Sequence, residues 1–115
     1  MALETEIVTR YVTIRNDRAY QIMIQTYHDK DTHLVSLRRF SKRLPQDIQR
    51  KAKMKLSLIE AATTLEDLRI PPGNHLEALS GDRAGQHSIR INAQWRICFV
   101  WKDGAAWDVE ITDYH

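Results

Sequence analysis

The fold of this chain is decided by residues 95–112, which read WRICFVWKDGAAWDVEIT. The first seven residues form an apolar run that is typical of a central β-strand. The Asp103-Gly104 pair that follows is the strongest short-range signal for a tight hairpin turn. The residues from 106 to 112 then alternate, which predicts a closing strand with Trp107, Val109 and Ile111 on one face. The stretch therefore predicts a hairpin within an antiparallel sheet.

Two further strands are predicted on the N-terminal side of this hairpin. One is a short strand at 75–79, and the other runs from His87 to Asn92 with Ile89 and Ile91 on one face. The Gly-containing stretch 81–85 separates them as a turn. The C-terminal half is thus expected to be a meander of about four strands.

Two helices are predicted before the sheet. Pro45 suits the first turn of a helix that ends near residues 61–62, and its apolar face consists of Ile48, Ala52, Leu56 and Ile59. Most of its cations lie on the other side. A shorter helix is predicted from a cap at Asp31 or Thr32 to about Lys42, with an apolar stripe of Leu34, Leu37 and Phe40.

Between the second helix and the sheet, Thr64 and Asp67 are spaced as in a capping box, which predicts an extra helical turn over 64–68. Residues 71–74, Pro-Pro-Gly-Asn, then break the chain. Nearer the N-terminus, residues 6–14 and 23–27 favour extended structure. The fold class is therefore α+β, with an N-terminal strand and two helices packed on a C-terminal antiparallel sheet of about four strands.

Length and composition indicate one globular domain. The chain has 115 residues, of which 43% are hydrophobic and 28% charged. Cys98 is the only cysteine, so an intramolecular disulfide is impossible, and its apolar neighbours favour a buried structural thiol over a nucleophile. There is neither an apolar run of about 18 residues nor a signal-peptide segment. We therefore expect a cytoplasmic protein that does not enter a membrane.

Positive charge is concentrated in residues 38–55, although the whole chain has a net charge of only +2. This stretch holds one carboxylate, Asp47, and eight cations: Arg38, Arg39, Lys42, Arg43, Arg50, Lys51, Lys53 and Lys55. Such a run is compatible with a solvated helix face. It is also compatible with a surface for a polyanion or an acidic partner, and charge alone leaves both interpretations open.

Several classes of site lack their sequence signals. The five histidines show no metal-ligand spacing and Cys98 has no cysteine partner, so no metal and no other cofactor is expected. A phosphate-binding glycine loop and a Gly-x-Ser-x-Gly nucleophile turn are also missing from the sequence.

Two polar features remain in the predicted sheet. Arg96 interrupts the most apolar strand, so it must face solvent, pair with an acid or bind an anion. Asp113-Tyr114-His115 continues the last strand; it is either a frayed end or a fixed polar cluster, and the α-carboxylate beside His115 would favour a protonated imidazole. Cleavage of RNA through its 2′-hydroxyl needs a base, positive charge for the phosphate and an acid for the leaving oxygen. These residue types can supply all three without a metal.

The sequence resembles a known toxin family over residues 23–115, most specifically in its C-terminal half. The motifs are 61–68 (AATTLEDL), 71–74 (PPGN), 76–83 (LEALSGDR), 88–92 (SIRIN), 94–99 (QWRICF), 108–111 (DVEI) and 113–115 (DYH). They are similar to those of the HigB, or plasmid-maintenance killer, branch of the RelE/ParE superfamily. Residues 1–22 lie outside the resemblance and form an N-terminal extension.

The resemblance implies a RelE-like fold and a type II toxin that cleaves translated messenger RNA on the ribosome. It implies that Arg96 contacts the scissile phosphate, that Tyr114 and His115 share the base, acid and orienting roles, and that Asp113 helps to position them. RNA or ribosome binding is expected from Arg38, Arg39, Lys42, Arg43, Arg83 and Arg90. The implied partner is a HigA-like helix-turn-helix antitoxin, in a toxin–antitoxin hetero-oligomer.

Two positions depart from the family pattern. Ser80 stands where relatives commonly have lysine, and Glu77 stands where some have a catalytic histidine. These departures motivate an alternative, a catalytically weakened toxin that keeps antitoxin binding. A further alternative is a non-enzymatic ParE-like gyrase poison, which would not need His and Tyr at a strand end.

Overall fold

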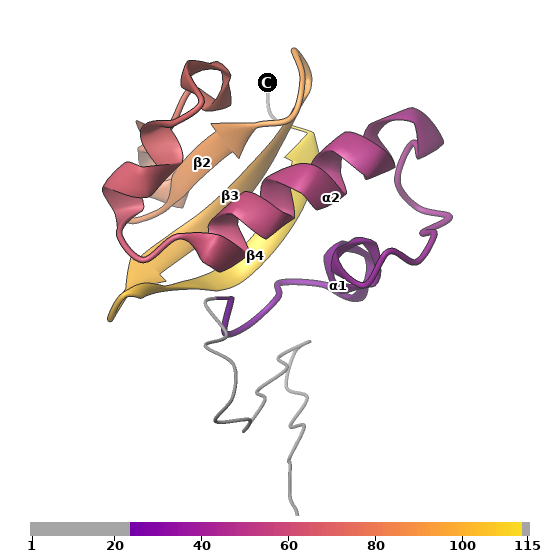
Figure 1. Cartoon of the computed structure of the whole chain (residues 1–115), viewed down its shortest axis with the longest axis horizontal. Coiled ribbons are helices and arrows are strands. Elements are labelled where there is room, and N and C mark those ends of the chain that lie inside the picture. The colour runs from indigo at the N-terminus through magenta and orange to yellow at the C-terminus, as the bar shows by residue number, and fades with distance from the viewer. Residues whose placement is uncertain (1–23, 114–115) are drawn as a thin grey trace, which may run out of the picture.

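The computed structural model describes residues 24–113, in which a long helix lies across one face of a four-stranded sheet (Figure 1). This helix is α2 (Gln46–Ala61). The sheet has the order β1-β2-β3-β4, and each neighbouring pair is antiparallel. Its strands are β1 (Glu77–Ala78), β2 (His87–Arg90), β3 (Trp95–Lys102) and β4 (Ala105–Asp113). The predicted α+β architecture, two helices on an antiparallel sheet, is confirmed.

The core forms between α2 and the sheet, as the apolar pattern predicts. The four residues of the α2 stripe are all buried. They belong to one cluster with Ile89, Ile91, Ile97 and Phe99 from the strands. Burying a side chain of this size contributes about 1.5 to 3 kcal/mol, so this interface holds the sheet in place.

The hairpin between β3 and β4 has the backbone that its sequence predicts. Asp103 and Gly104 have φ values of 55° and 74°. A two-residue hairpin turn whose twist matches that of the strands needs positive φ at both central residues. Asp and Gly adopt positive φ at little energetic cost.

A β-bulge in β4 changes which side chains reach the core. Cys98 pairs with Glu110 and Val100 pairs with Trp107, so β4 has one more residue than β3 between these pairs. Asp108, at φ 55°, lies within this irregularity. As a result Ala106 and Val109 both enter the core cluster, and the prediction that Trp107 shares the face of Val109 and Ile111 is wrong. The Trp107 Nε1–H instead donates to the Lys102 carbonyl, 3.0 Å away.

Helix α1 (Lys30–Ser36) is shorter than the sequence pattern predicts. Its N-cap is Asp29, which accepts a bond of 2.7 Å from the Thr32 N–H, and not Asp31 or Thr32. The helix stops because Arg38 takes φ 63°, and the N–H groups of Arg38 and Arg39 bond the carbonyls of Val35 and Leu34. The expected stripe therefore fails beyond Leu34. Leu37 and Phe40 are exposed.

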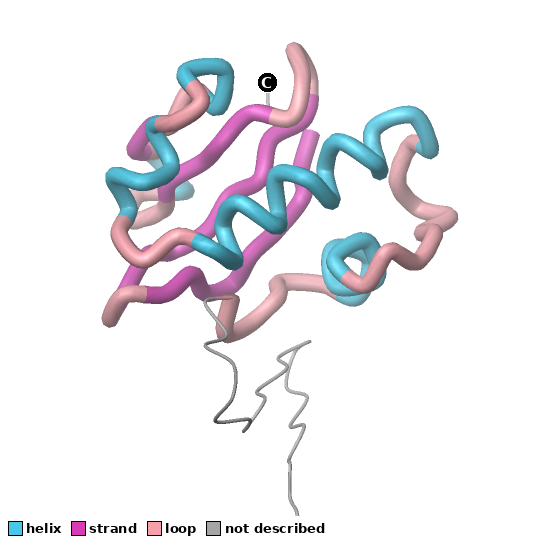
Figure 2. Tube along the Cα trace, in the orientation of Figure 1, coloured by secondary structure: helices cyan, strands magenta, loops and turns pink. Residues whose placement is uncertain are grey.

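Short helical turns connect α2 to β1 (Figure 2). These are η1 (Leu65–Arg69), which has the predicted capping box of Thr64 and Asp67, and η2 (Pro72–Asn74). A third turn, η3 (Gly81–Arg83), precedes β2. The buried Lys55 ammonium of α2 donates to the Asn74 side chain and so ties η2 to the helix. Burial lowers the pKa of Lys55.

The segment before α1 runs beside β4. Ile24 and Tyr27 form parallel bridges to Ala106 and Val109, so the strand predicted at 23–27 is reduced to two bridges. The strand predicted at 6–14 lies outside the described residues, as do Tyr114 and His115. Among residues 24–113, no helix is both long and apolar enough to cross a bilayer.

Candidate active site on the open face of the sheet

The face of the sheet opposite α2 carries the polar side chains of the central strands. Ser88 is the partner of Glu77 on β1 and of Cys98 on β3, and Cys98 is the partner of Glu110 on β4. These four residues form a row across the sheet. Arg90 and Arg96 are partners in a second row, beside Thr112. Because side chains alternate along a strand, both rows project away from the core.

Arg96 is fixed on this face by groups from other parts of the chain. Its Nε donates to the Ser88 hydroxyl at 2.7 Å, and its Nη2 donates to the His75 carbonyl at 2.7 Å. The same Nη2 lies 3.2 Å from Glu77 Oε1. The Arg96 side chain is only 12% exposed, so its guanidinium is held rigidly at the surface of the sheet. Arg96 therefore pairs with an acid, Glu77, and is still accessible from the open face. Pairing with an acid and binding an anion, two of the roles predicted from the sequence, are thus compatible.

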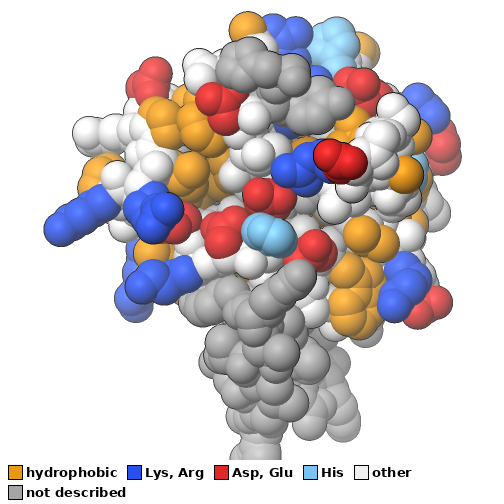
Figure 3. Space-filling model, turned by 180° about the vertical axis from the view of Figure 1, so that it is seen from behind, with side chains coloured by type: hydrophobic (Ala, Val, Ile, Leu, Met, Phe, Trp, Pro, Cys, Tyr) orange, Lys and Arg blue, Asp and Glu red, His pale blue; other side chains and the backbone are white. Residues whose placement is uncertain are grey.

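A second group of interacting polar side chains lies on the same face, around Glu110 of β4. Arg83 Nη1 donates to Gln86 Oε1 at 2.9 Å and contacts Glu110 Oε1 at 3.2 Å. His28 Nδ1 lies 3.3 Å from Asp108 Oδ1, and its Nε2 lies 3.9 Å from Glu110 Oε2. Figure 3 looks at this face and shows acidic side chains on both sides of a histidine, with cationic side chains beside them. The face is therefore a mosaic of both charges.

Cys98 lies between these two networks. Burial raises the pKa of its thiol; Arg83 and Arg96 oppose the rise, and Glu110 and Glu77 add to it. Cys98 is 1% exposed, which confirms the prediction of a buried structural cysteine. Cys98 is thus part of the floor of the site and not a nucleophile.

Asp113 is the last residue of β4. Asp113 is the partner of Trp95, next to Arg96, and it accepts a bond of 2.9 Å from Gln94 Nε2. Asp113 is thus held at the strand end. The positions of Tyr114 and His115 are not described.

The remaining predicted binding residues fall into two groups. Arg83 and Arg90 are on the sheet face, and Arg90 stands directly opposite Arg96. The other four, from Arg38 to Arg43, lie around the end of α1, where Arg43 Nε is 3.7 Å from Asp31. The structure therefore separates the open face of the sheet from a basic surface around α1.

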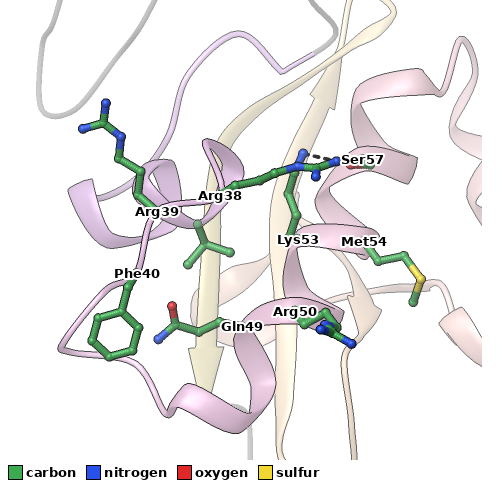
Figure 4. Close-up of a pocket in the computed structure, with 9 residues that line it drawn as sticks. Arg38, Arg39, Phe40, Gln49, Arg50, Lys53, Met54 and Ser57 are labelled. Atoms are coloured by element: carbon green, nitrogen blue, oxygen red, sulfur yellow. Dashed lines mark hydrogen bonds between the residues drawn. The ribbon is translucent and has the colours of Figure 1, made fainter.

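That basic surface contains a groove of about 580 Å³ between α1 and α2. In Figure 4, Arg38 extends toward Lys53 and Ser57 of α2, whereas Arg39 points away from the helix. Phe40, 58% exposed, and Met54 supply apolar surface. The groove is lined by Val35, Arg38, Arg39, Phe40, Gln49, Arg50, Lys53, Met54 and Ser57, without a carboxylate among them.

Sequence reasoning missed several contributors to both surfaces. The strand register brings Ser88 to Arg96 and Glu110 to Cys98, and the His75 carbonyl also reaches Arg96. Local sequence patterns do not specify this register. Arg50 and Lys53 join the groove because they are three residues apart on one helix face. That spacing was visible in the sequence.

Comparison with known proteins assigns the chain to a family. Residues 16–115 match the family model described as RelE-like toxin of type II toxin-antitoxin system HigB. The chain belongs to the HigB-like toxin family. Toxin HigB-1 of Vibrio cholerae is 40% identical over 82 residues, which cover 71% of this chain and 78% of that protein. Endoribonuclease HigB of Proteus vulgaris is 33% identical over 94 residues, which cover 81% of this chain and 100% of that protein.

Membership of the HigB-like family confirms the resemblance inferred from the C-terminal motifs. The chain is therefore a toxin of a type II toxin–antitoxin system, and it has an antitoxin partner. The family match begins at residue 16, on the N-terminal side of the resemblance at residue 23.

Proposed function

We propose that this toxin is a metal-independent endoribonuclease that cleaves messenger RNA during translation, on the ribosome and in the cytoplasm. Endoribonuclease activity is supported by the HigB-like family and by the relative named Endoribonuclease HigB, which the match covers completely. We also propose a HigA-like helix-turn-helix protein as the antitoxin, in a hetero-oligomer with the toxin.

The observation that carries this proposal is the fixed guanidinium of Arg96 on the open face of the sheet. A planar guanidinium offers paired donors that match the oxygens of a phosphodiester, and a rigid one needs little rearrangement as charge develops. Arg96 is only 12% exposed and is bonded to both Ser88 and the His75 carbonyl. It is therefore suited to hold the scissile phosphate.

The proton transfers are proposed to come from the segment that follows β4. The Cα partner of Arg96 is Thr112, immediately before Asp113-Tyr114-His115. We propose that Tyr114 and His115 share the base, acid and orienting roles and that Asp113 positions them. Arg83 and Arg90 would contact neighbouring phosphates of the RNA.

Metal independence is proposed because the site already holds a cation, Arg96. Within residues 24–113, no three His, Cys, Asp or Glu side chains are placed to hold a metal ion. A site of structural or catalytic zinc needs at least three protein ligands. The guanidinium of Arg96 would supply the positive charge that a metal supplies in other nucleases.

The first prediction tests the proposed function directly. Mapping of RNA ends should show cleavage within translated messenger RNA when ribosomes are present, and little cleavage of the same RNA alone. Toxin that has been treated with EDTA and dialysed should retain its full rate on intact ribosomes. Equal cleavage with and without ribosomes would contradict ribosome dependence, and activity regained only on addition of a transition metal would contradict metal independence.

The basic groove is proposed to dock the toxin on ribosomal RNA. Arg38 and Arg39 are exposed, and the groove adds Arg50, Lys53 and the exposed ring of Phe40. Cations bind phosphates, and an exposed aromatic ring can stack on an unpaired base. Lys42 and Arg43 would extend this contact, although Arg43 also pairs with Asp31.

The second prediction concerns this groove. Arg38→Gln combined with Arg39→Gln should weaken ribosome binding and lower the slope of log K against log salt by up to about two, because each lost phosphate contact removes about one. Arg50→Gln with Lys53→Gln should act similarly. The matched control neutralises Arg69 and Lys102, which are exposed elsewhere. Identical slopes in all variants would mean that the groove is a solvated face. Antitoxin affinity should be measured in parallel.

A second candidate function has one observation in its favour. Two arginines of the site are paired with carboxylates, Arg96 with Glu77 and Arg83 with Glu110, each at 3.2 Å. Ser80 stands where relatives commonly have lysine, so the site also lacks that cation. A toxin homologue that binds its antitoxin and cleaves RNA slowly would fit this charge balance.

A further inference from the structure

Lys55 and Asn74 form a buried polar pair between α2 and the η2 turn. Lys55 is 6% exposed and Asn74 is 0% exposed, and the Lys55 ammonium donates to the Asn74 side-chain oxygen. Taking an ammonium out of water is costly. Burial accordingly lowers the pKa of Lys55, and the charge of Lys51 adds to this effect. An apolar side chain of similar volume would avoid that cost, so the pair is expected to do more than fill space.

The Asn74 side chain fixes the backbone around it. Its Nδ2 donates to the Leu68 carbonyl at 3.0 Å and to the Ile70 carbonyl at 3.3 Å. Its Oδ1 accepts from Lys55, and its backbone N–H donates to the Pro71 carbonyl at 2.9 Å. The helix α2 and the turns η1 and η2 are therefore joined at one buried side chain.

The residue after Asn74 supplies an acceptor to Arg96. The His75 carbonyl accepts a bond of 2.7 Å from Arg96 Nη2. His75 has φ 46° and ψ 56°, in the left-handed region, and its N–H donates to the Pro72 carbonyl at 3.1 Å. Few residues other than glycine adopt this region. The direction of the His75 carbonyl therefore depends on the support that the turn receives from Asn74.

We propose that Lys55 and Asn74 are positioning residues of the cleavage reaction. They act through the His75 carbonyl, which orients the guanidinium of Arg96 for the scissile phosphate. This inference rests on the proposed ribonuclease function, in which Arg96 binds that phosphate. The contacts form one continuous path from α2, through the η2 turn, to Arg96 of β3. Misplacing a reacting or binding group by about 1 Å can cost about 100-fold in rate, even when the change is made far from the chemistry.

The competing interpretation is that the pair only stabilises the fold. Loss of either partner leaves a buried polar group unpaired, which lowers stability in both interpretations. The two interpretations differ in the rate of toxin that is fully folded. A structural pair leaves that rate unchanged well below the melting temperature. A positioning pair slows the chemical step and leaves ribosome affinity as it was.

The third prediction uses Lys55→Met, which removes the ammonium and keeps an unbranched, adaptable side chain. Single-turnover cleavage at saturating ribosome should slow by about 10-fold or more, because the carbonyl that holds Arg96 is less well fixed. Ribosome affinity should stay within about twofold, since the groove cations are unchanged. The control is Ile59→Val, one turn further along α2 at a residue that is 0% exposed. It leaves a small cavity and lowers stability, but the rate should not change.

A double-mutant cycle with Arg96 separates positioning from a purely structural role. The Arg96→Lys background has no Nη2 for the carbonyl to hold. In that background Lys55→Met should slow cleavage further by less than about twofold, because residues that act as a unit are not additive. A merely structural pair would give the same factor in both backgrounds.

Substitutions at His75 test the same carbonyl from the surface, because this side chain is exposed. His75→Gly keeps the left-handed backbone, which glycine adopts readily, and should cleave within about twofold of the parent rate. His75→Val should slow cleavage by about 10-fold or more, because a β-branched residue disfavours positive φ and turns the carbonyl away from Arg96. Both variants lack the imidazole, so a role of the ring itself would affect them equally.

The outcomes separate this inference from the function on which it rests. Cleavage at the parent rate by folded Lys55→Met or by His75→Val overturns the positioning path and leaves the ribonuclease. Equal losses in the two His75 variants have the same meaning, as does a Lys55→Met factor that is the same in the parent and Arg96→Lys backgrounds. A parent toxin that cleaves no RNA, with or without ribosomes, overturns the proposed function and this inference together.

Discussion

Replacing Arg96 with lysine is expected to slow the cleavage step by roughly 30- to 1,000-fold, equivalent to about 2 to 4 kcal/mol of transition-state stabilisation. Lysine keeps the positive charge but has a single ammonium group in place of a planar fork. In the structure, Nε serves Ser88 while Nη2 serves the His75 carbonyl and Glu77. One ammonium cannot maintain these contacts and also clamp a phosphate.

The measurement is single-turnover cleavage at saturating ribosome, together with ribosome affinity and the melting temperature of the variant. Arg69→Lys is the control, because Arg69 also pairs with a glutamate, 2.6 Å away, but on the exposed η1 turn. A near-normal rate for Arg96→Lys would reject the phosphate clamp. A loss explained entirely by weaker ribosome binding would assign Arg96 to docking.

The sequence predicted the sheet and α2 because their signals are local. The Asp103-Gly104 pair meets the positive φ requirement of the turn by itself. The α2 stripe needs only the helical period to place Leu56 and Ile59 against the strands. Such elements can be predicted without knowledge of their neighbours.

The errors arose where one backbone residue departs from regular geometry. Arginine rarely adopts positive φ, so nothing in the residue type indicated that Arg38 would end α1 before Leu37 and Phe40. Asp108 similarly inserts a bulge that removes Trp107 from the core face. Both irregularities shape the surfaces described above. The early end of α1 leaves Phe40 in the basic groove, and the bulge in β4 places Asp108 beside His28.

Only part of the candidate site could be predicted from the sequence, because the rest depends on the strand register. Arg96 was identifiable as a cation within an apolar strand, and its need for a partner or an anion followed from burial. The identity of that partner depends on the register of β1, β2 and β3, which brings Glu77 and Ser88 to it. The roles of Arg96 and of the final motif stay predictions, because the family comparison gives the family and no residue roles.

The other large effect is expected at His115, where His115→Ala should abolish growth arrest on induced expression and slow single-turnover cleavage by about 100-fold or more. The reason is loss of the group that we propose as the acid for the departing 5′-oxygen. The melting temperature of the variant should be measured beside that of the parent, so that a loss of activity through unfolding is recognised. Full growth arrest by a folded His115→Ala toxin would reject the catalytic assignment.

A change of leaving group can tell which residue is the acid. An RNA with sulfur in place of the scissile 5′-oxygen releases a thiolate, which departs without a proton because thiols are far stronger acids than alcohols. His115→Ala should therefore cleave this substrate at nearly the parent rate. If Tyr114→Phe is rescued by sulfur and His115→Ala is not, the acid is Tyr114, and His115 then has the orienting role.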